Sequence, residues 1–284
     1  MGIRAYWEEA TNAIVKSGRF LLAVPMFVFP VLHFFYPDFV ASIVPPWIPW
    51  HLFWTYFTAL TIIAAGLSIV SGKYAGVAAT LLGIEIFLFC ALIHVPLLLN
   101  RPGDAWAGAA MFGSMPSRRV NAFKDFGLCG AVFVFAGMQL RESRRSAGRV
   151  LMTIGSLILA LSIAGFGVLH FLYPAFAPGI PPMQVNISFP IPGHLLWVYL
   201  TGVFFVVSAL CLAINQKVKT AATLVGLVIL LFDLLTWVPI FIVNPIRMTG
   251  NWLKDIGIVG GVFILAESLS LKGDPKRSTA GGPL

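Results

Sequence analysis

The chain has 284 residues, of which 58% are hydrophobic and only 11% are charged. A soluble domain carries about 25% charged residues, so this composition excludes an ordinary soluble protein. The net charge is +8, and in a chain with repeated apolar runs of about 20 residues such an excess of Lys and Arg is expected in cytoplasmic loops, not in a nucleic-acid interface.

The first part of the chain is predicted to stay outside the membrane. Residues 1–18 hold charged side chains and precede the first long apolar run, so we expect a short cytoplasmic or interfacial segment there and no cleavable signal peptide. Eight apolar spans follow, and each is predicted to be a transmembrane helix, because a helix satisfies its backbone hydrogen bonds within the bilayer and no alternating barrel pattern is present. The predicted spans are 19–36, 51–71, 74–99, 122–140, 150–173, 194–214, 218–243 and 252–271.

The chain contains a tandem repeat. The motif H-F-F-Y-P-D-F at His33–Phe39 returns as H-F-L-Y-P-A-F at His170–Phe176, and both copies are followed by a Pro-Pro pair and by H-L-x-W-x-Y. Each half ends with N-x-x-K-D-x-G-x-x-G, at Asn121–Gly130 and at Asn251–Gly260. So many matches in the same order indicate a duplication. The predicted units are the repeats 19–140 and 150–271, the basic cytoplasmic linker 141–149, and a tail, 272–284, expected to be disordered in the cytoplasm.

The distribution of positive charge predicts the orientation of the protein. With four spans in each half, both copies enter the membrane from the same side, so the repeats are parallel and not inverted. The N-terminus, the linker, the tail and the loops after spans two and six hold 13 of the 19 Lys and Arg residues, and such residues favour the cytoplasmic side. The sequence therefore predicts an all-α, polytopic plasma-membrane protein with eight transmembrane helices and both termini in the cytoplasm.

This topology brings the repeated polar residues of each half to the extracytoplasmic face. The His-Tyr pair at the end of the first span and the His-Trp pair at the start of the second have i,i+3 spacing, which places both members on one helix face. Ionisable groups at span ends that face a bundle are candidates for function. The candidate ligand-binding residues are His33, Tyr36, His51, Trp54, Asn121, Lys124 and Asp125 in the first half and His170, Tyr173, His194, Trp197, Asn251, Lys254 and Asp255 in the second.

Each type of candidate residue also has a structural explanation. Trp54 and Trp197 are typical of the aromatic belt at a membrane interface. The Lys-Asp pairs could cap the start of a helix, with Asp at the positive end of the helix dipole and Lys reaching towards the lipid headgroups. The His residues could serve packing alone, through a hydrogen bond to a neighbouring carboxylate.

Two acids within predicted spans have no counterpart in the other half: Glu85 in the first half and Asp233 in the second. A carboxylate in the bilayer costs roughly 2.5–3.5 kcal/mol on insertion scales, so each requires a partner or a proton. We interpret them either as interhelical hydrogen-bonding groups or as proton-handling groups. When the halves are aligned, Glu85 faces Val228, Asp233 faces Cys90 and His94 faces Trp237.

The ordered motifs of each half, H-F-x-Y-P-x-F, P-P, H-L-x-W-x-Y and N-x-x-K-D-x-G-x-x-G, resemble the DoxX-like family of small four-helix membrane proteins. The resemblance covers both halves, 19–140 and 150–271. DoxX-like proteins are similar to the small membrane subunit of an archaeal thiosulfate:quinone oxidoreductase. The resemblance implies a four-helix unit, here doubled, and an association with quinone or thiol redox chemistry in the membrane.

Three functional hypotheses stay open. In the first, the chain is a redox-associated subunit that binds a quinone or a similar small molecule near the extracytoplasmic face and receives electrons from a membrane or periplasmic redox partner. In the second, it transports a small molecule or lipid through the cleft between the repeats, with Glu85 and Asp233 in the lining. In the third, it is a non-catalytic membrane assembly or stress factor. The three cysteines stand alone, so no metal site is expected, and no residue is assigned a catalytic role.

Overall fold

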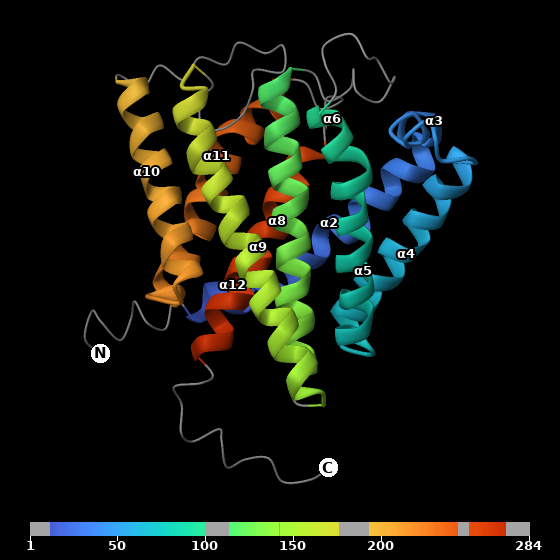
Figure 1. The fold of residues 1–284 in the computed structure, drawn as a ribbon, viewed down its shortest axis with the longest axis horizontal. Helices are drawn as coiled ribbons and strands as arrows, with labels where there is room; N and C mark the ends of the chain where they lie inside the picture. Colours follow the sequence, from blue (N-terminus) through green and yellow to red (C-terminus); the bar gives the residue numbers. More distant parts are fainter. Residues whose placement is uncertain (1–11, 100–113, 142, 176–192, 244–249, 271–284) are drawn as a thin grey trace.

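The computed structural model describes residues 12–99, 114–141, 143–175, 193–243 and 250–270 (Figure 1). Within these ranges every regular element is helical, which confirms the predicted all-α class. Most of the predicted N-terminal segment, the tail and the second Pro-Pro pair lie outside the described residues. The helices are α2 (Gly18–Phe35), α3 (Pro37–Ala41), α4 (His51–Ser71), α5 (Ala75–Phe89), the π-helical turn η1 (Cys90–His94), α6 (Val95–Leu99), α8 (Met115–Leu140), α9 (Arg145–Leu172), α10 (His194–Ala213), α11 (Val218–Val243) and α12 (Asn251–Ser270).

Seven helices in the described part of the chain are long and apolar enough to cross a membrane, so the chain is a multi-pass membrane protein. The first is Asn12–Phe35, which contains α2 and the helical residues just before it. The others are α4, α5 continued through η1 and α6, α8, α9, α10 and α11. The last helix, α12, has 20 residues and carries Lys254, Asp255 and Glu267. Its position in the bundle, described below, provides partners for two of these charges.

Most helix boundaries agree with the hydropathy pattern, but α8 does not. It begins at Met115, seven residues before the predicted span, with Ser114 in an extended conformation ahead of it and Pro116 in its first turn. Pro is well suited to that position, because its missing N–H has no partner at a helix start. Hydropathy placed the start of this span at residue 122 because Arg118 and Arg119 are polar, although both residues are in the helix. Lys124 therefore lies about 13 Å along the helix and not at its beginning.

The third span is continuous but changes its winding at η1 (Cys90–His94). Pro96 follows this turn in α6. Proline has no N–H and its ring crowds the carbonyl four residues earlier, and a wider π-helical turn accommodates that loss. The turn also directs His94, which is buried, towards the interior of the bundle.

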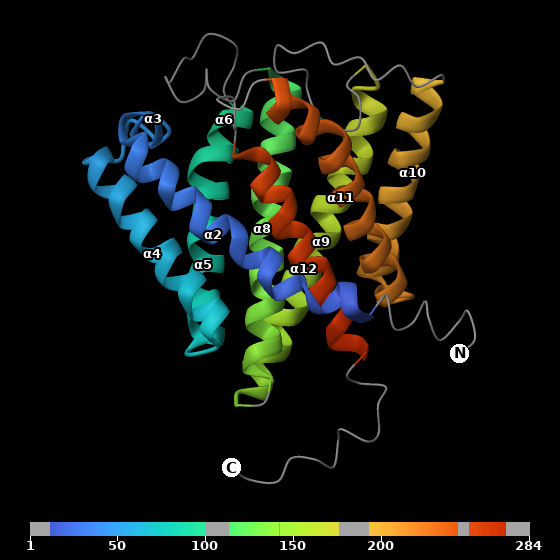
Figure 2. The same ribbon diagram turned by 180° about the vertical axis from the view of Figure 1, so that it is seen from behind.

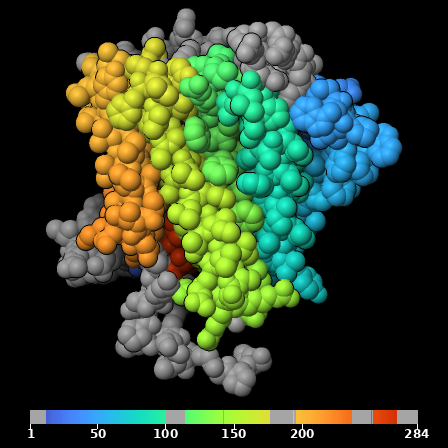
Figure 3. All heavy atoms as spheres, viewed as in Figure 1, coloured from blue at the N-terminus to red at the C-terminus, as the bar shows by residue number. Residues whose placement is uncertain are grey.

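The two fourth helices of the predicted repeats, α8 and α12, form the centre of the molecule. In the most apolar part of α8, 78% of the residues are buried, compared with 33–44% in the other six spans. Figures 1 and 2 show α8 and α12 in the middle, with α2 crossing diagonally beside α12. In the space-filling view, α5, α8, α9 and α10 cover one face and only a small part of α12 is visible between α9 and α10 (Figure 3).

Three of the large helix contacts link one half of the chain to the other: α8 with α9, α12 with α2, and α12 with α8. Helix α8 packs most extensively on α9, and α12 packs on α2, α8 and α11. By contrast, the first and fourth helices of the same half, α2 with α8 and α9 with α12, pack only lightly. The fourth helix of each half thus completes its packing against the first helix of the other half, and the halves form one bundle.

Glycines allow these cross-half contacts to be close. A Cβ atom on Gly130 of α8 would lie 2.8 Å from the carbonyl oxygen of Gly155 in α9. A Cβ atom on Gly260 of α12 would lie 2.6 Å from the carbonyl oxygen of Gly18 in α2. Real Cβ atoms do not approach backbone this closely, so both crossings need glycine, as in other small-residue helix contacts in membranes.

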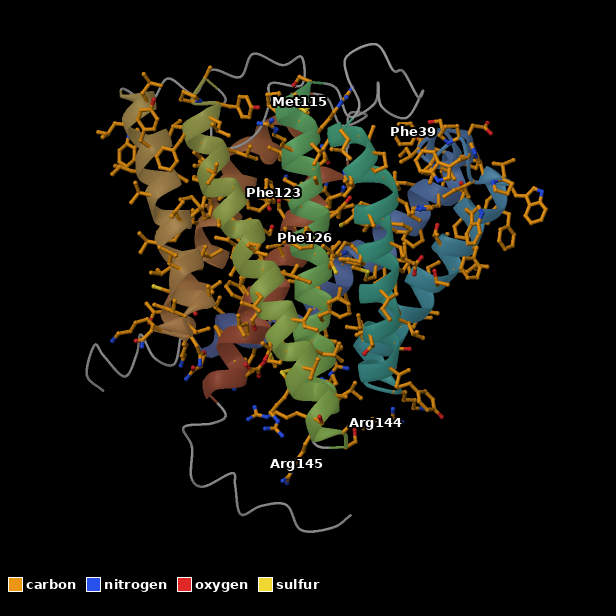
Figure 4. The ribbon with its side chains drawn as sticks, viewed as in Figure 1. Phe39, Met115, Phe123, Phe126, Arg144 and Arg145 are labelled. Atoms are coloured by element: carbon orange, nitrogen blue, oxygen red, sulfur yellow. The ribbon has the colours of Figure 1, made fainter. Side chains whose placement is uncertain are left out.

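One end of the bundle is basic. The turns between α4 and α5, between α8 and α9, and between α10 and α11 lie at this end, as do the start of α2 and the end of α12 (Figures 1 and 2). Arg144 and Arg145 project from it (Figure 4). At the same end, Arg19 donates hydrogen bonds of 2.6 Å to the carbonyls of Ile69 and Val70 and so closes the last turn of α4.

Candidate functional site

Six ionisable residues meet where α8 and α12 cross, and we call them the buried charge cluster. They come from four segments of the chain: the Lys-Asp motif of α8, the Lys-Asp motif of α12, the π-helical turn and α11. Lys124 and Asp255 are 6% and 7% exposed, so the cluster is within the bundle and not on its surface. The members are His94, Lys124, Asp125, Asp233, Lys254 and Asp255.

The centre of the cluster is a pair of reciprocal ion pairs between the halves. The Lys124 ammonium in α8 donates to Asp255 Oδ2 in α12, and the Lys254 ammonium in α12 donates to Asp125 Oδ1 in α8 at 2.7 Å. Each Lys-Asp motif therefore pairs with the other copy and not with itself. Ion pairs taken out of water are tolerated only when each charge has a well-placed partner, and the exchange provides one for all four residues.

The approach of α8 and α12 explains why short aspartate side chains reach across. A Cβ atom on Gly261 would lie 2.5 Å from the Cα atom of Ala131, so the two backbones are nearly in contact. Lys124 and Asp125 lie between Phe123 and Phe126, well below Met115 at the start of α8 (Figure 4). This depth excludes the helix-cap explanation of Lys124 and Asp125, because a cap acts within the first turn.

A third partner at each aspartate breaks the symmetry of the ion pairs. His94 Nε2 lies 2.5 Å from Asp125 Oδ2. On the other side, Asp233 of α11 lies within hydrogen-bonding reach of the Asp255 carboxyl. Asp125 is thus joined by the imidazole of His94 and Asp255 by the carboxyl of Asp233. The two Lys-Asp ion pairs, by contrast, are equivalent.

The two histidines of the H-F-x-Y-P-x-F motifs have the same local contact. His33 Nδ1 donates to the Phe29 carbonyl and His170 Nδ1 donates to the Phe166 carbonyl, both at 2.7 Å. This bond leaves Nε2 as an acceptor in the neutral ring. His170 is only 2% exposed, and its Nε2 has no hydrogen-bond partner in the described part of the chain.

Aromatic rings and a hydrogen-bonded Tyr surround His170. The ring of Phe205 in α10 lies 5.7 Å from the imidazole, and Phe166 contacts both Phe205 and Phe123. Three residues beyond His170, the Tyr173 hydroxyl accepts a hydrogen bond of 2.7 Å from Arg119 of α8. The end of α9 in the second half is therefore completed by α8 of the first half.

Three other candidate residues lie at the surface. Tyr36, Trp54 and Trp197 are 60%, 38% and 55% exposed, which places them on the outer surface, as residues of an aromatic belt would be. His51 is half-buried at the start of α4. Asn121 is buried and donates to the Ser117 carbonyl one turn earlier in α8. The side chains of His194, Trp237 and Asn251 lie outside the described residues.

Glu85 and Asp233 have different surroundings. The Thr61 hydroxyl of α4 donates to Glu85 Oε1 of α5 at 2.8 Å, so Glu85 joins two helices of the first half by a hydrogen bond. Asp233 belongs to the buried charge cluster, and its Oδ2 has no hydrogen-bond partner among the described residues. No group of three or more His, Cys, Asp or Glu residues in this part of the chain could hold a metal ion.

Sequence reasoning did not identify three of these partners. Thr61 and Arg119 carry no repeated motif, and Phe205 is one of 24 phenylalanines in the chain. The signal for Arg119 was its position in the same helix as the first Lys-Asp motif.

No protein-family model matches this chain, and comparisons with curated proteins and with solved structures found no match either.

Proposed function

We propose that the chain is an integral membrane protein of the DoxX-like type, built from two parallel four-helix repeats. Equivalent residues make equivalent contacts, which supports the repeat. Gly130 packs on Gly155 as Gly260 packs on Gly18, and both pairs are aligned by the repeated motifs. In the same way, the Gly83 position faces Phe133 and the Gly226 position faces Phe263.

The same repeat makes α12 the eighth transmembrane helix. Its three charges would oppose insertion of an isolated helix. Two of them, Lys254 and Asp255, are paired with Asp125 and Lys124 of α8, which removes most of that cost. The basic end of the bundle supports a plasma-membrane orientation with both termini in the cytoplasm. His33 and His170 then lie near the extracytoplasmic face.

The function that this arrangement supports best is that of a redox-associated subunit that binds a quinone or a similar small molecule near the extracytoplasmic face. The observation that carries it is the buried Nε2 of His170, which has no hydrogen-bond partner in the described residues. A buried acceptor without a partner costs about 1–3 kcal/mol. A ligand hydroxyl that donates to this nitrogen would recover that free energy.

The surroundings of His170 favour a ring with a hydroxyl group. The rings of Phe166 and Phe205 offer faces and edges for stacking, and the reduced form of a quinone supplies the hydroxyl donor. The Arg119–Tyr173 pair places a second polar group at the same end of α9. A bound quinone would supply the redox chemistry, while these residues would orient its headgroup. Electrons would come from a membrane or periplasmic redox partner.

The test is to purify the full chain and to measure its absorption spectrum and its co-purifying quinones and lipids by mass spectrometry. We expect a quinone in the wild type and a loss of at least about tenfold in His170→Phe, since a lost hydrogen bond to a buried group costs about 1.4 kcal/mol or more. Tyr199→Phe is the matched control, because Tyr199 stacks on Phe171 at the outer surface. Equal quinone content and equal binding of added quinone in all three proteins would contradict the proposal.

Two alternatives keep specific support. The complete pairing of Lys124, Asp125, Lys254 and Asp255 is what a non-catalytic assembly factor would need to hold its halves together. The unpartnered Oδ2 of Asp233 between the halves is what a small-molecule or lipid transporter would use. Flux into liposomes that stops in Asp233→Asn would favour transport. Loss of stability alone in the His170 variant would favour the assembly factor.

A further inference from the structure

The two sides of the buried charge cluster are alike in their ion pairs and unlike in their third member. Lys124–Asp255 and Lys254–Asp125 are equivalent under the repeat. His94 adds an imidazole to one side, where the second half has Trp237 in the sequence alignment. Asp233 adds a carboxyl to the other side, where the first half has Cys90. The ion pairs hold the halves together, and the difference between the sides lies in these two residues.

The charges of the cluster do not balance. Two ammonium groups face three carboxyl groups, and a neutral His94 can donate its Nε2 proton to Asp125 without changing the sum. With all three aspartates ionised, the cluster would carry one net negative charge. Within a bilayer an uncompensated charge is strongly disfavoured, so the cluster is expected to take up one proton.

The geometry indicates which group carries this proton. Lys124 donates to Asp255, so the Asp255 carboxylate already has a counter-charge. Asp233 lies beside Asp255, and two carboxylates at hydrogen-bonding distance repel each other unless one is protonated. No described ammonium or imidazole group is within ion-pair distance of Asp233. A protonated Asp233 can donate to Asp255 and remove the repulsion.

We propose that the buried charge cluster is a proton-binding site in which Asp233 carries one exchangeable proton. The charged groups that face Asp233 are Lys124 of α8 and Asp255 of α12. Lys254 of α12 acts on Asp255 and pairs with Asp125. Helix α10 also packs on α11, but from Leu195 to Ala213 it has no charged residue and so adds no charge near Asp233. Helix α5 packs on η1 and carries Glu85, which is held by Thr61. This inference goes beyond the proposed function, because it does not require a bound quinone.

The site has two states that differ by one proton. In the protonated state the cluster is neutral and Asp233 donates to the Asp255 carboxylate, which also accepts from Lys124. In the deprotonated state the proton has left for water and the cluster carries one negative charge. Because Asp255 is on α12 and Lys124 is on α8, the change alters the contact between the two halves.

Infrared spectroscopy of the full chain in lipid tests the proposal. The carbonyl stretch of a protonated carboxylic acid is separate from carboxylate bands and shifts in heavy water. We expect the wild type at neutral pH to show a component equal to one protonated acid per chain that is absent from Asp233→Asn. Asp233→Cys, which introduces the residue type of the equivalent position in the first half, is the second variant and should lose the same component.

Glu85→Gln is the matched control, since Glu85 is also an acid in a span but lies outside the cluster. It should keep the component that Asp233→Asn loses. The proposal is overturned if both Asp233 variants retain the full wild-type band. It is also overturned if the band disappears only in Glu85→Gln, because the exchangeable proton would then belong to Glu85.

Discussion

Removing one charge from the reciprocal ion pairs should destabilise the whole bundle. In Lys124→Met the side chain keeps its length and apolar stem, but Asp255 loses its donor. Both residues are at most 7% exposed, so water cannot replace the lost ammonium. Breaking a buried pair on one side costs about 3–5 kcal/mol, and the protonated carboxyl of Asp233, which still donates to Asp255, places the expected value in the lower part of that range.

The assay is reversible unfolding of the purified full chain in mixed micelles, followed by far-ultraviolet circular dichroism. Lys219→Met is the control, because Lys219 Nζ bonds Asn12 Oδ1 at 3.1 Å at the surface. We expect the control to change the free energy of unfolding by less than about 0.5 kcal/mol. The double variant Lys124→Met/Asp255→Leu removes both charges and should regain most of the loss, because an apolar pair can replace a buried ion pair.

Two results would refute this reasoning. One is a Lys124→Met variant as stable as the Lys219→Met control, which would mean that the pair is solvated. The other is a double variant whose loss equals the sum of its two single losses, since residues that interact directly must show a coupling free energy.

Three further predictions concern packing and topology. Gly260→Ala should cost about 1–3 kcal/mol of unfolding free energy, because its Cβ would lie 2.4 Å from a backbone nitrogen of α2. Gly76→Ala should cost less, because its Cβ would meet only side-chain atoms, of Leu140 and Gln139. Thr61→Val should cost about 0.6–1.7 kcal/mol by removing the α4–α5 hydrogen bond, again measured by unfolding. With a membrane-impermeant maleimide, Asp38→Cys should react in intact cells and Ser143→Cys only after permeabilisation; the reverse pattern would contradict the orientation.

The sequence alone determined most of the helices. Length and apolar content defined α4 at 51–71 and α11 at 218–243 with the bounds that the structure has, because crossing hydrocarbon requires a continuous apolar helix. The start of α8 was missed because Arg118 and Arg119 lower hydropathy without preventing helix formation. Trp54 and Trp197 were selected as binding candidates, yet both face outwards, since the sequence does not say which face of a span meets lipid.

Only the tertiary structure decided the partners of the repeated polar residues. Lys124 pairs with Asp255, 131 residues away, and not with its neighbour Asp125, because successive residues of a helix point about 100° apart. That pairing depends on the crossing of α8 and α12 and on the exchange of fourth helices between the halves. His94 likewise reaches the cluster through the π-helical turn, and Asp233 through the packing of α11 on α12. A duplicated sequence contains the same charges twice, and the way the two copies pack selects which charges meet.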